Sequence, residues 1–258
     1  MTEPTRTATG GDGGVRSIQR ALDLLSLFDR QHSSRSLREL MVETGLPKTT
    51  VVRLLATLES RALVSRRDET TYLPGPGFLR WVRMASALWE LSQDNRTVLR
   101  ALVDSCGETA NVYVRQELTR ISIAQEEGTA TVRSVVEVGS AMPLSRGATA
   151  RVLLSGAPGD VLDRLAEQDP SIDASSLERQ VSAIRETGYA VSHGERELGA
   201  SAVAAPVLGQ DGRVIAALSV SGPTSRFTAE RVHRYVEQVV ASAATLTDQG
   251  LGNVEALL

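Results

Sequence analysis

The sequence predicts an α+β protein of two domains, joined by an apolar helix. Three observations carry this expectation. Residues 36–61 read as two short amphipathic helices around a glycine and a proline. A short hairpin pattern follows at residues 63–73. Beyond residue 93, strand-like apolar runs are flanked by helical patterns, which indicates an antiparallel sheet with helices beside it.

Composition limits the class of protein. Hydrophobic residues make up 41% of the 258 residues and charged residues 23%, as in ordinary soluble domains. No apolar run is long enough to cross a membrane, and the N-terminus lacks a signal-peptide core. The single cysteine, Cys106, excludes an intrachain disulfide and suits a reducing compartment. We therefore expect a cytoplasmic location and no membrane partner.

Charge is distributed unevenly along the chain. Residues 15–91 contain twelve basic and eight acidic side chains, whereas residues 92–258 contain fifteen and twenty-one. A basic first part and an acidic second part is the asymmetry expected when one end of a protein faces phosphates. The excess is small, so two copies of the chain would bind DNA more strongly than one.

The first 14 residues are rich in Thr and Gly and are expected to be a disordered tail. Residues 15–30 predict a supporting helix with one apolar face, formed by Ile18, Ala21, Leu22, Leu25 and Phe28. Arg16 and Arg20 lie near its start, where they either reach DNA phosphates or are simply solvated.

The helix pair has clear start and stop signals. Ser36 and Glu39 match a capping box, Gly45 stands where helices end in a left-handed residue, and Pro47 suits the start of the next helix. The second helix has an apolar back of Val51, Leu54, Leu55 and Leu58, and a polar front of Lys48, Thr49, Val52, Arg53 and Ala56.

Such a front fits a DNA major groove, although a solvated helical hairpin gives the same pattern. The hairpin at residues 63–73 favours DNA binding, because it would be the wing of a winged helix-turn-helix. Lys48, the only lysine in the chain, adds to this. We expect Arg53 to read a base and wing residues to hold phosphate. The predicted DNA contacts are Arg16, Arg20, Ser36, Lys48, Thr49, Thr50, Arg53, Arg66 and Arg67.

Residues 78–92 predict a linker helix with a wide apolar arc that contains both tryptophans. Dimerisation through this helix would bury the arc, and packing onto the chain's own domains is the alternative. In a two-fold dimer, the reading helices would be about 34 Å apart and would recognise a palindromic operator. The expected domain limits are 15–77, 78–92 and 93–248.

The second domain is expected to begin with a helix over 94–105. Predicted strands follow at 110–115, 121–125, 132–138, 190–193, 200–208 and 214–221, and predicted helices at 147–155, 160–168, 176–187 and 228–246. In the last strand, Val214, Ala216, Leu218 and Val220 would share one face. Small residues on the other face, such as Ser219 and Ser221, leave room for a ligand or for close helix packing.

The sequence resembles the IclR family of bacterial transcriptional regulators over nearly its whole length. The segments that carry this resemblance are VRSIQRALDLLSLF, GLPKTTVVRLLATLESRALV, ETANVYV, VEVGSAMPLSRGATARVLLS, IRETGYAV, AAPVLGQDGRVIAALSVSGP and SRFT. The resemblance implies a winged helix-turn-helix, a linker helix and a C-terminal effector-binding domain similar to GAF domains. It also implies a dimer or tetramer that responds to a small molecule, often a carboxylate. Repression is the commoner mode in such proteins, and activators occur.

By the same resemblance, the segment Met142–Thr149 lies over an effector pocket, where backbone N–H groups near a helix N-terminus would suit a carboxylate. The sequence departs from the family at Ser192-His193, Ser145 and Ala202, which stand where relatives often have an acidic pair, a histidine and a cysteine. The predicted effector contacts are Met142, Leu144, Arg146, Ala148, Thr149, Ser192, Ala202, Ser219 and Ser221.

Two other functions compete with this interpretation. An enzyme is disfavoured, because the sequence contains no nucleophile elbow, phosphate-binding loop or metal-spaced Cys/His cluster. No cofactor and no metal are expected. The remaining alternative is a DNA-binding protein whose C-terminal domain serves only oligomerisation or partner docking.

Overall fold

The computed structural model describes residues 15–29 and 31–258, so the expected tail and Arg30 lie outside the described residues. Contacts divide the chain into two compact units between Ser86 and Ala87. This division falls inside helix α4 (Phe78–Trp89). Each unit is therefore described by itself.

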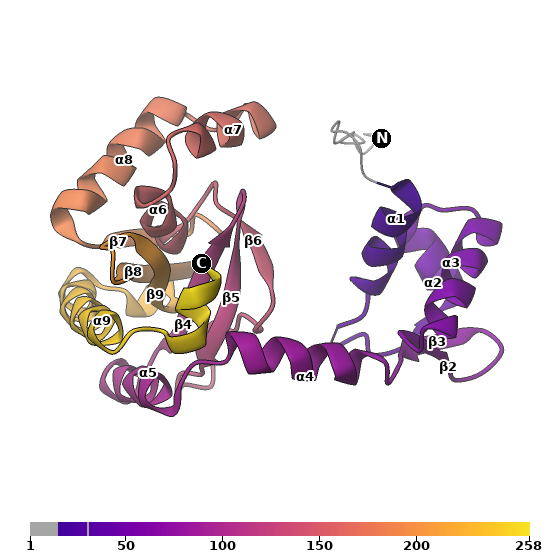
Figure 1. Ribbon diagram of the computed structural model, residues 1–258. Helices are drawn as coiled ribbons and strands as arrows, with labels where there is room; N and C mark the ends of the chain where they lie inside the picture. Colours follow the sequence, from indigo (N-terminus) through magenta and orange to yellow (C-terminus); the bar gives the residue numbers. More distant parts are fainter. Residues whose placement is uncertain (1–14, 30) are drawn as a thin grey trace. The chain divides into compact units, whose positions relative to one another are not determined.

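The first unit contains the expected helix pair and wing. Its elements are α1 (Arg16–Leu25), β1 (Arg35–Ser36), α2 (Leu37–Thr44), α3 (Lys48–Ser60), β2 (Val64–Arg66) and β3 (Thr71–Pro74). Figure 1 labels all of these except the short strand β1. The strands form an antiparallel sheet in the order β1-β3-β2. One buried cluster joins the helices to this sheet, and it consists of Leu24, Leu40, Val51, Leu55, Leu58, Val64 and Tyr72.

Helix α1 differs from the prediction. It ends at Leu25, and the amides of Leu27 and Phe28 then bond to carbonyls three residues back. Phe28 packs against the core from this turn and not from the helix. The predicted apolar face treated Phe28 as a helical residue, and that face is therefore misplaced around α1. Leu24 is the buried residue, and Ile18 and Leu22 are exposed.

The turn after β3 packs tightly against the end of α3. The Gly75 amide donates to the Leu63 carbonyl at 2.8 Å, and the Gly77 amide donates to the Ala62 carbonyl at 2.8 Å. A Cβ atom at Gly75 would lie 2.1 Å from the Ala62 carbonyl oxygen. Only glycine allows this approach.

We expect Gly75→Ala to lower the stability of the first unit by about 1–3 kcal/mol, because the added methyl group meets backbone that cannot yield freely. Denaturant unfolding, with hydrogen exchange to localise the change, measures the loss. Gly159→Ala is the control, since nothing lies within 4 Å of its added Cβ. Equal unfolding midpoints for the two variants would contradict the expectation.

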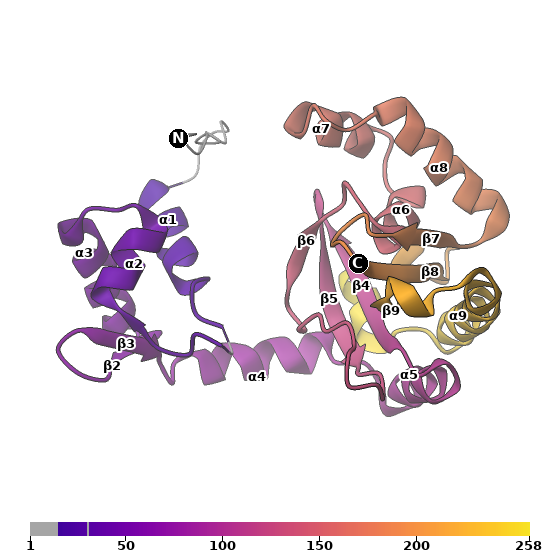
Figure 2. The same ribbon diagram turned by 180° about the vertical axis from the view of Figure 1, so that it is seen from behind.

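The second unit is a six-stranded sheet with helices on both faces (Figures 1 and 2). The strand order is β6-β5-β4-β9-β8-β7, and every pairing is antiparallel. Helices α5 and α9 cover one face, and α6 and α8 cover the other. The elements are α5 (Gln93–Cys106), β4 (Thr109–Gln116), β5 (Thr119–Glu126), β6 (Ala141–Pro143), α6 (Ala148–Ser155), α7 (Asp160–Gln168), α8 (Ala174–Thr187), β7 (Ala190–His193), β8 (Ala200–Leu208), β9 (Val214–Pro223), η1 (Thr224–Arg226), α9 (Ala229–Gln249) and η2 (Gly252–Leu257).

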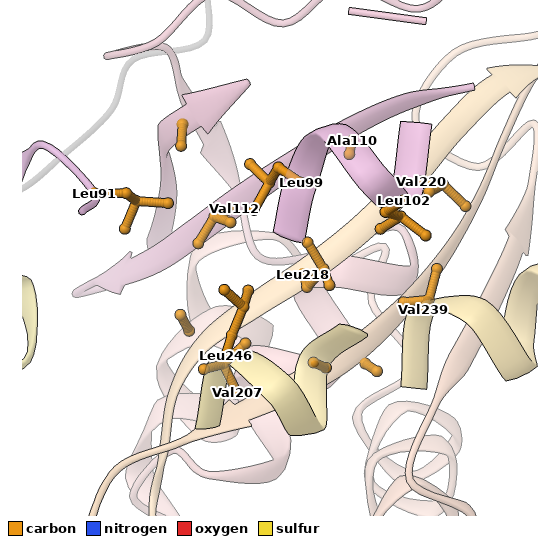
Figure 3. Packing of buried hydrophobic residues seen from close by; sticks show 14 of the residues in the cluster. Leu91, Leu99, Leu102, Ala110, Val112, Val207, Leu218, Val220, Val239 and Leu246 are labelled. Carbon is orange, nitrogen blue, oxygen red and sulfur yellow. The ribbon is translucent and has the colours of Figure 1, made fainter. Parts of the chain in front are cut away.

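Each face of this sheet has its own core. Toward α5 and α9, aliphatic side chains such as Leu99, Leu218 and Leu246 interlock, as Figure 3 shows. Toward α6 and α8, Leu154, Val181 and other residues form the second cluster. Within the described part of the chain, no helix is long and apolar enough to span a bilayer.

The predicted strand at 132–138 is wrong. Val132, Val135 and Val138 are exposed, and the Val136 amide donates to the side chain of Gln125 at 2.8 Å instead of to a backbone carbonyl of a neighbouring strand. The edge position is taken by β6, within the segment expected to be a loop.

The face assignment of β9 is wrong at its start. The pairing with β8 shifts at Val207/Leu208, so that Val214 lies against the α6 side and Ile215 against the α9 side. From Ala216 to Ser221 the expected alternation holds.

Candidate nucleic-acid interface and ligand cavity

Local hydrogen bonds define the turn between α2 and α3. The Glu39 amide donates to Ser36 Oγ at 3.2 Å, and the Ser36 amide donates to Glu39 Oε2 at 2.6 Å, which completes the capping box. These bonds lower the pKa of the Glu39 carboxyl, with the Ser36 amide as the main cause. Gly45 ends α2 at a φ of 63°, and Pro47 precedes the first residue of α3.

The same bonds bear on the predicted DNA contact of Ser36. Its hydroxyl donates to Glu39 Oε2 at 2.7 Å, and its amide is also bonded to that carboxylate. Phosphate oxygens need donors, and both donors of Ser36 are already used. Its observed role is to begin α2.

Helix α3 has a buried back and a free polar front, as predicted. Val51, Leu55 and Leu58 are buried, whereas Lys48 and Arg53 are exposed together with Thr49, Val52 and Ala56. Thr50 is half-buried. No described residue forms a hydrogen bond or ion pair with the side chains of Lys48 or Arg53, so both charges are free to contact an external anion.

The wing presents two arginines in different states. Arg66 Nη2 lies 3.6 Å from Glu59 Oε2, and its guanidinium stands 5.4 Å from the centre of the Tyr72 ring. The Arg67 side chain is exposed and has no partner among the described residues. Arg16 and Arg20, also exposed, lie on α1. The first unit therefore carries all the predicted DNA contacts on its surface except Thr50 and Ser36, which are half-buried.

The second unit contains a cavity of about 40 Å³ on the α6 side of the sheet. Six predicted effector contacts line it: Met142, Ala148, Thr149, Ser192, Ala202 and Ser221. The other three do not. Leu144 is part of the buried cluster on this face, Ser219 is buried, and the Arg146 side chain is exposed. The effector contacts stay predictions.

Arg120 also lines the cavity and was not predicted from the sequence. It lies on β5 with only 3% of its surface exposed. Its Nη1 donates to the carbonyls of Pro143 and Arg146, the latter at 3.1 Å. Its Nε has no hydrogen-bond partner, and no described carboxylate lies within ion-pair distance. The Tyr113 ring centre is 5.9 Å from its Cζ. Burial lowers the pKa of Arg120 to about 10, so it remains charged at neutral pH.

The helix N-terminus predicted to receive a carboxylate already holds one. The Gly147 amide, directly before α6, donates to Glu195 Oε2 at 3.1 Å. Arg151 Nη1 donates to both oxygens of Glu195, at 2.9 and 2.8 Å. Glu195 belongs to the turn between β7 and β8, so this turn is tied to α6.

No catalytic arrangement is assembled around the histidine of β7. Ser192 faces the cavity and His193 is exposed, so they point apart as predicted. His193 Nδ1 lies 2.9 Å from Ser201 Oγ, which bonds to Thr224 Oγ1 at 2.8 Å. Among the described residues, no carboxylate is hydrogen-bonded to this histidine, so a Ser–His–acid triad is not formed.

Comparisons with known proteins match both units of the chain to one family. Residues 17–68 match the model of the IclR helix-turn-helix domain, and residues 86–248 match the model of the bacterial transcriptional regulator IclR C-terminal domain. The chain is 30% identical to the HTH-type transcriptional regulator BhcR of Paracoccus denitrificans, over 91% of this chain and 87% of that protein.

Solved structures give the same result. The chain is 43% identical to an IclR-family regulator from Rhodococcus sp., with a TM-score of 0.63 and coverage of 98% and 100% of the two chains. It also has the fold of an IclR homologue from Microbacterium hydrocarbonoxydans that is complexed with 4-hydroxybenzoate. That match has 19% identity, a TM-score of 0.73 and coverage of 93% and 99%.

Proposed function

The chain belongs to the IclR family of bacterial transcriptional regulators, and from this premise we propose that it is a dimeric repressor whose operator affinity depends on a small carboxylate. It is a DNA-binding transcriptional regulator with an effector-binding C-terminal domain. The proteins it resembles are regulators and not enzymes by name. The proposal adds that the protein is a dimer, that its operator is palindromic, that it represses transcription and that its effector is a carboxylate.

The free polar front of α3 is the observation that carries the proposal. Lys48 and Arg53 are exposed cations whose side chains have no partner among the described residues, on a helix whose other side is buried in the core. We propose that Arg53 reads a guanine edge, that Lys48 and Thr49 contact the DNA from the start of the helix, and that Arg67 holds phosphate from the wing. Arg16, Arg20, Thr50 and Arg66 complete the proposed contacts.

Exposed apolar side chains support self-association. On α4, Leu79 is 70% exposed and Trp81 is 53% exposed, and Val82, Met84 and Leu88 are exposed as well. A soluble monomer rarely leaves such a cluster in water. A two-fold pair formed here would set two α3 helices about 34 Å apart and so match a palindromic operator. A tetramer would combine two such pairs.

Trp81→Glu is expected to weaken self-association at least about tenfold, because it places a charge in a desolvated apolar contact. Analytical ultracentrifugation without DNA measures the change. Val42→Glu, on the exposed side of α2, is the control and should associate as the unaltered protein does. A Trp81→Glu variant that associates normally would exclude α4 as the dimer contact.

The ligand part of the proposal concerns the cavity on the α6 side of the sheet. Three of its lining residues are serines, and one of them, Ser221, has a buried hydroxyl oxygen without a partner among the described residues. Buried polar atoms normally have a partner, so this hydroxyl favours a polar ligand over close packing alone. We take residues 93–248 as the effector-binding domain and residues 15–77 as the DNA-binding domain, with 78–92 as the linker.

Selection of genomic fragments by the full-length protein tests the function directly. We expect enrichment of a palindromic sequence near promoters, and transcription from such a promoter in vitro should fall when the protein is added. Carboxylates that release the protein from this DNA would support an effector role. If no ligand that binds in the cavity changes the DNA affinity, the result would instead favour a C-terminal domain that serves only oligomerisation or partner docking.

A further inference from the structure

We propose that Arg120 is the anion anchor of the cavity, and that the ligand it selects is a small carboxylate with a single negative charge. This inference rests on the proposed function and deepens it. The group that binds the carboxylate would then be a side chain on β5, and not the backbone N–H groups at the N-terminus of α6 that the sequence led us to expect.

The first argument is the missing counter-charge. A buried guanidinium is normally paired, because an uncompensated charge in a protein interior is costly. Around Arg120 the described residues supply two backbone carbonyls for Nη1 and nothing for Nε. The positive charge of Arg196, also at the cavity, adds repulsion. A bound carboxylate would supply the missing charge and accept from the free edge of the guanidinium.

The second argument is the presence of unpaired polar atoms at the cavity. Five buried side-chain polar atoms lack a partner in the described part of the chain. Two of them, Arg120 Nε and Ser221 Oγ, belong to residues that line the cavity. Buried polar atoms are normally hydrogen-bonded, so two unpaired ones at one cavity indicate a missing polar ligand.

The third argument excludes the other seat. Glu195 accepts from the Gly147 amide and from Arg151, so the entrance to α6 is already neutralised. A second carboxylate there would have to displace that of Glu195. Arg120 is close by, since its Nη2 would be 3.7 Å from a Cβ atom at Gly147. Among the described residues, Arg151 is paired with Glu195 and Arg196 with Glu197, whereas Arg120 has no ion-pair partner. One negative charge would therefore balance the site, which favours a singly charged ligand.

The size of the cavity sets the class of ligand. One water needs about 10–15 Å³ in this kind of measurement, so the 40 Å³ present holds roughly three groups of that size. The three heavy atoms of a carboxylate group fill that space, so the carbon end of the ligand must be small. The Tyr113 ring and Met142 supply an apolar side for its carbon end.

Binding of ¹³C-labelled acetate to the full-length protein, followed by NMR, tests the inference with the smallest suitable probe. Acetamide, which has the same shape without the charge, is measured alongside at equal ionic strength. We expect saturable binding of acetate and none of acetamide. Arg120→Met should weaken acetate binding about tenfold or more, and Arg213→Met, on an exposed turn, should not change it.

Arg120→Lys keeps the charge but not the forked donors, so its acetate affinity should fall between those of the unaltered protein and Arg120→Met. If Arg120→Met fails to fold, the acetate affinity of Arg120→Lys alone tests the role of Arg120. Absence of acetate binding in the unaltered protein, or undiminished binding in a folded Arg120 variant, overturns the inference. Operator binding is measured on the same samples. Its presence without acetate binding refutes the anchor alone, whereas its absence refutes the proposed function.

Discussion

Arg53→Ala is expected to remove most of the preference for the selected operator while leaving binding to unrelated DNA nearly unchanged. A forked contact between arginine and guanine is worth about 1–3 kcal/mol, and a dimer makes it twice. Arg53 is suited to this contact because it is exposed on α3 and engages no described residue. Fluorescence anisotropy with operator and scrambled DNA, at one salt concentration, gives the ratio of the two affinities.

Arg67→Ala provides the comparison for this result. A phosphate contact from the wing contributes equally on all sequences, so its loss should weaken both affinities together and reduce the salt dependence by about one charge per copy. If Arg53→Ala behaves in the same way as Arg67→Ala, Arg53 holds phosphate and does not read a base.

Arg226→Met is expected to destabilise the second unit by about 3–5 kcal/mol at neutral pH, because it leaves a buried carboxylate without its partner. Glu108 is 1% exposed, and Arg226 donates to its two oxygens at 2.6 Å each. The Tyr235 hydroxyl lies 3.4 Å from the same carboxylate. The pair therefore joins the start of β4 to η1 and α9.

The charge of Arg226 is present over the whole neutral range. The hydrogen bond with Glu108 raises the pKa of Arg226 above its ordinary value, so the guanidinium stays protonated and its contribution to stability is present in full at neutral pH. Denaturant unfolding of Arg226→Met and of the unaltered protein at neutral pH measures the loss.

The double variant Glu108→Gln/Arg226→Met is the control. It removes both charges and should recover much of the lost stability. A double variant as unstable as Arg226→Met would show that the packing of the Arg226 side chain matters and its charge does not.

The helix-turn-helix could be predicted in detail because its signals are local. The capping box of Ser36 and Glu39, the left-handed Gly45 and the buried stripe of α3 each depend on residues within one or two helical turns. The limits of β7 and the antiparallel sheet could also be predicted, because the alternation of apolar and polar residues and the glycines in the turns indicate them.

The errors arose where distant residues decide the structure. The segment 132–138 has the composition of a strand, but the Gln125 side chain takes the amide of Val136, and β6 takes the sheet edge. Arg120 looked like one more arginine in an alternating strand. Its burial depends on the approach of the Pro143–Gly147 segment, which no local pattern reveals. Glu195 reaches α6 from a turn that follows forty residues later, and so was missed for the same reason.

Methylation interference on the selected operator tests the central claim most directly, namely that two copies of α3 lie in the major groove. Methylation of guanine N7 marks the major groove, and methylation of adenine N3 marks the minor groove. The account predicts that N7 methylation blocks binding at two symmetric half-sites about 10 base pairs apart. Interference at only one half-site, or only at adenine N3, would contradict it.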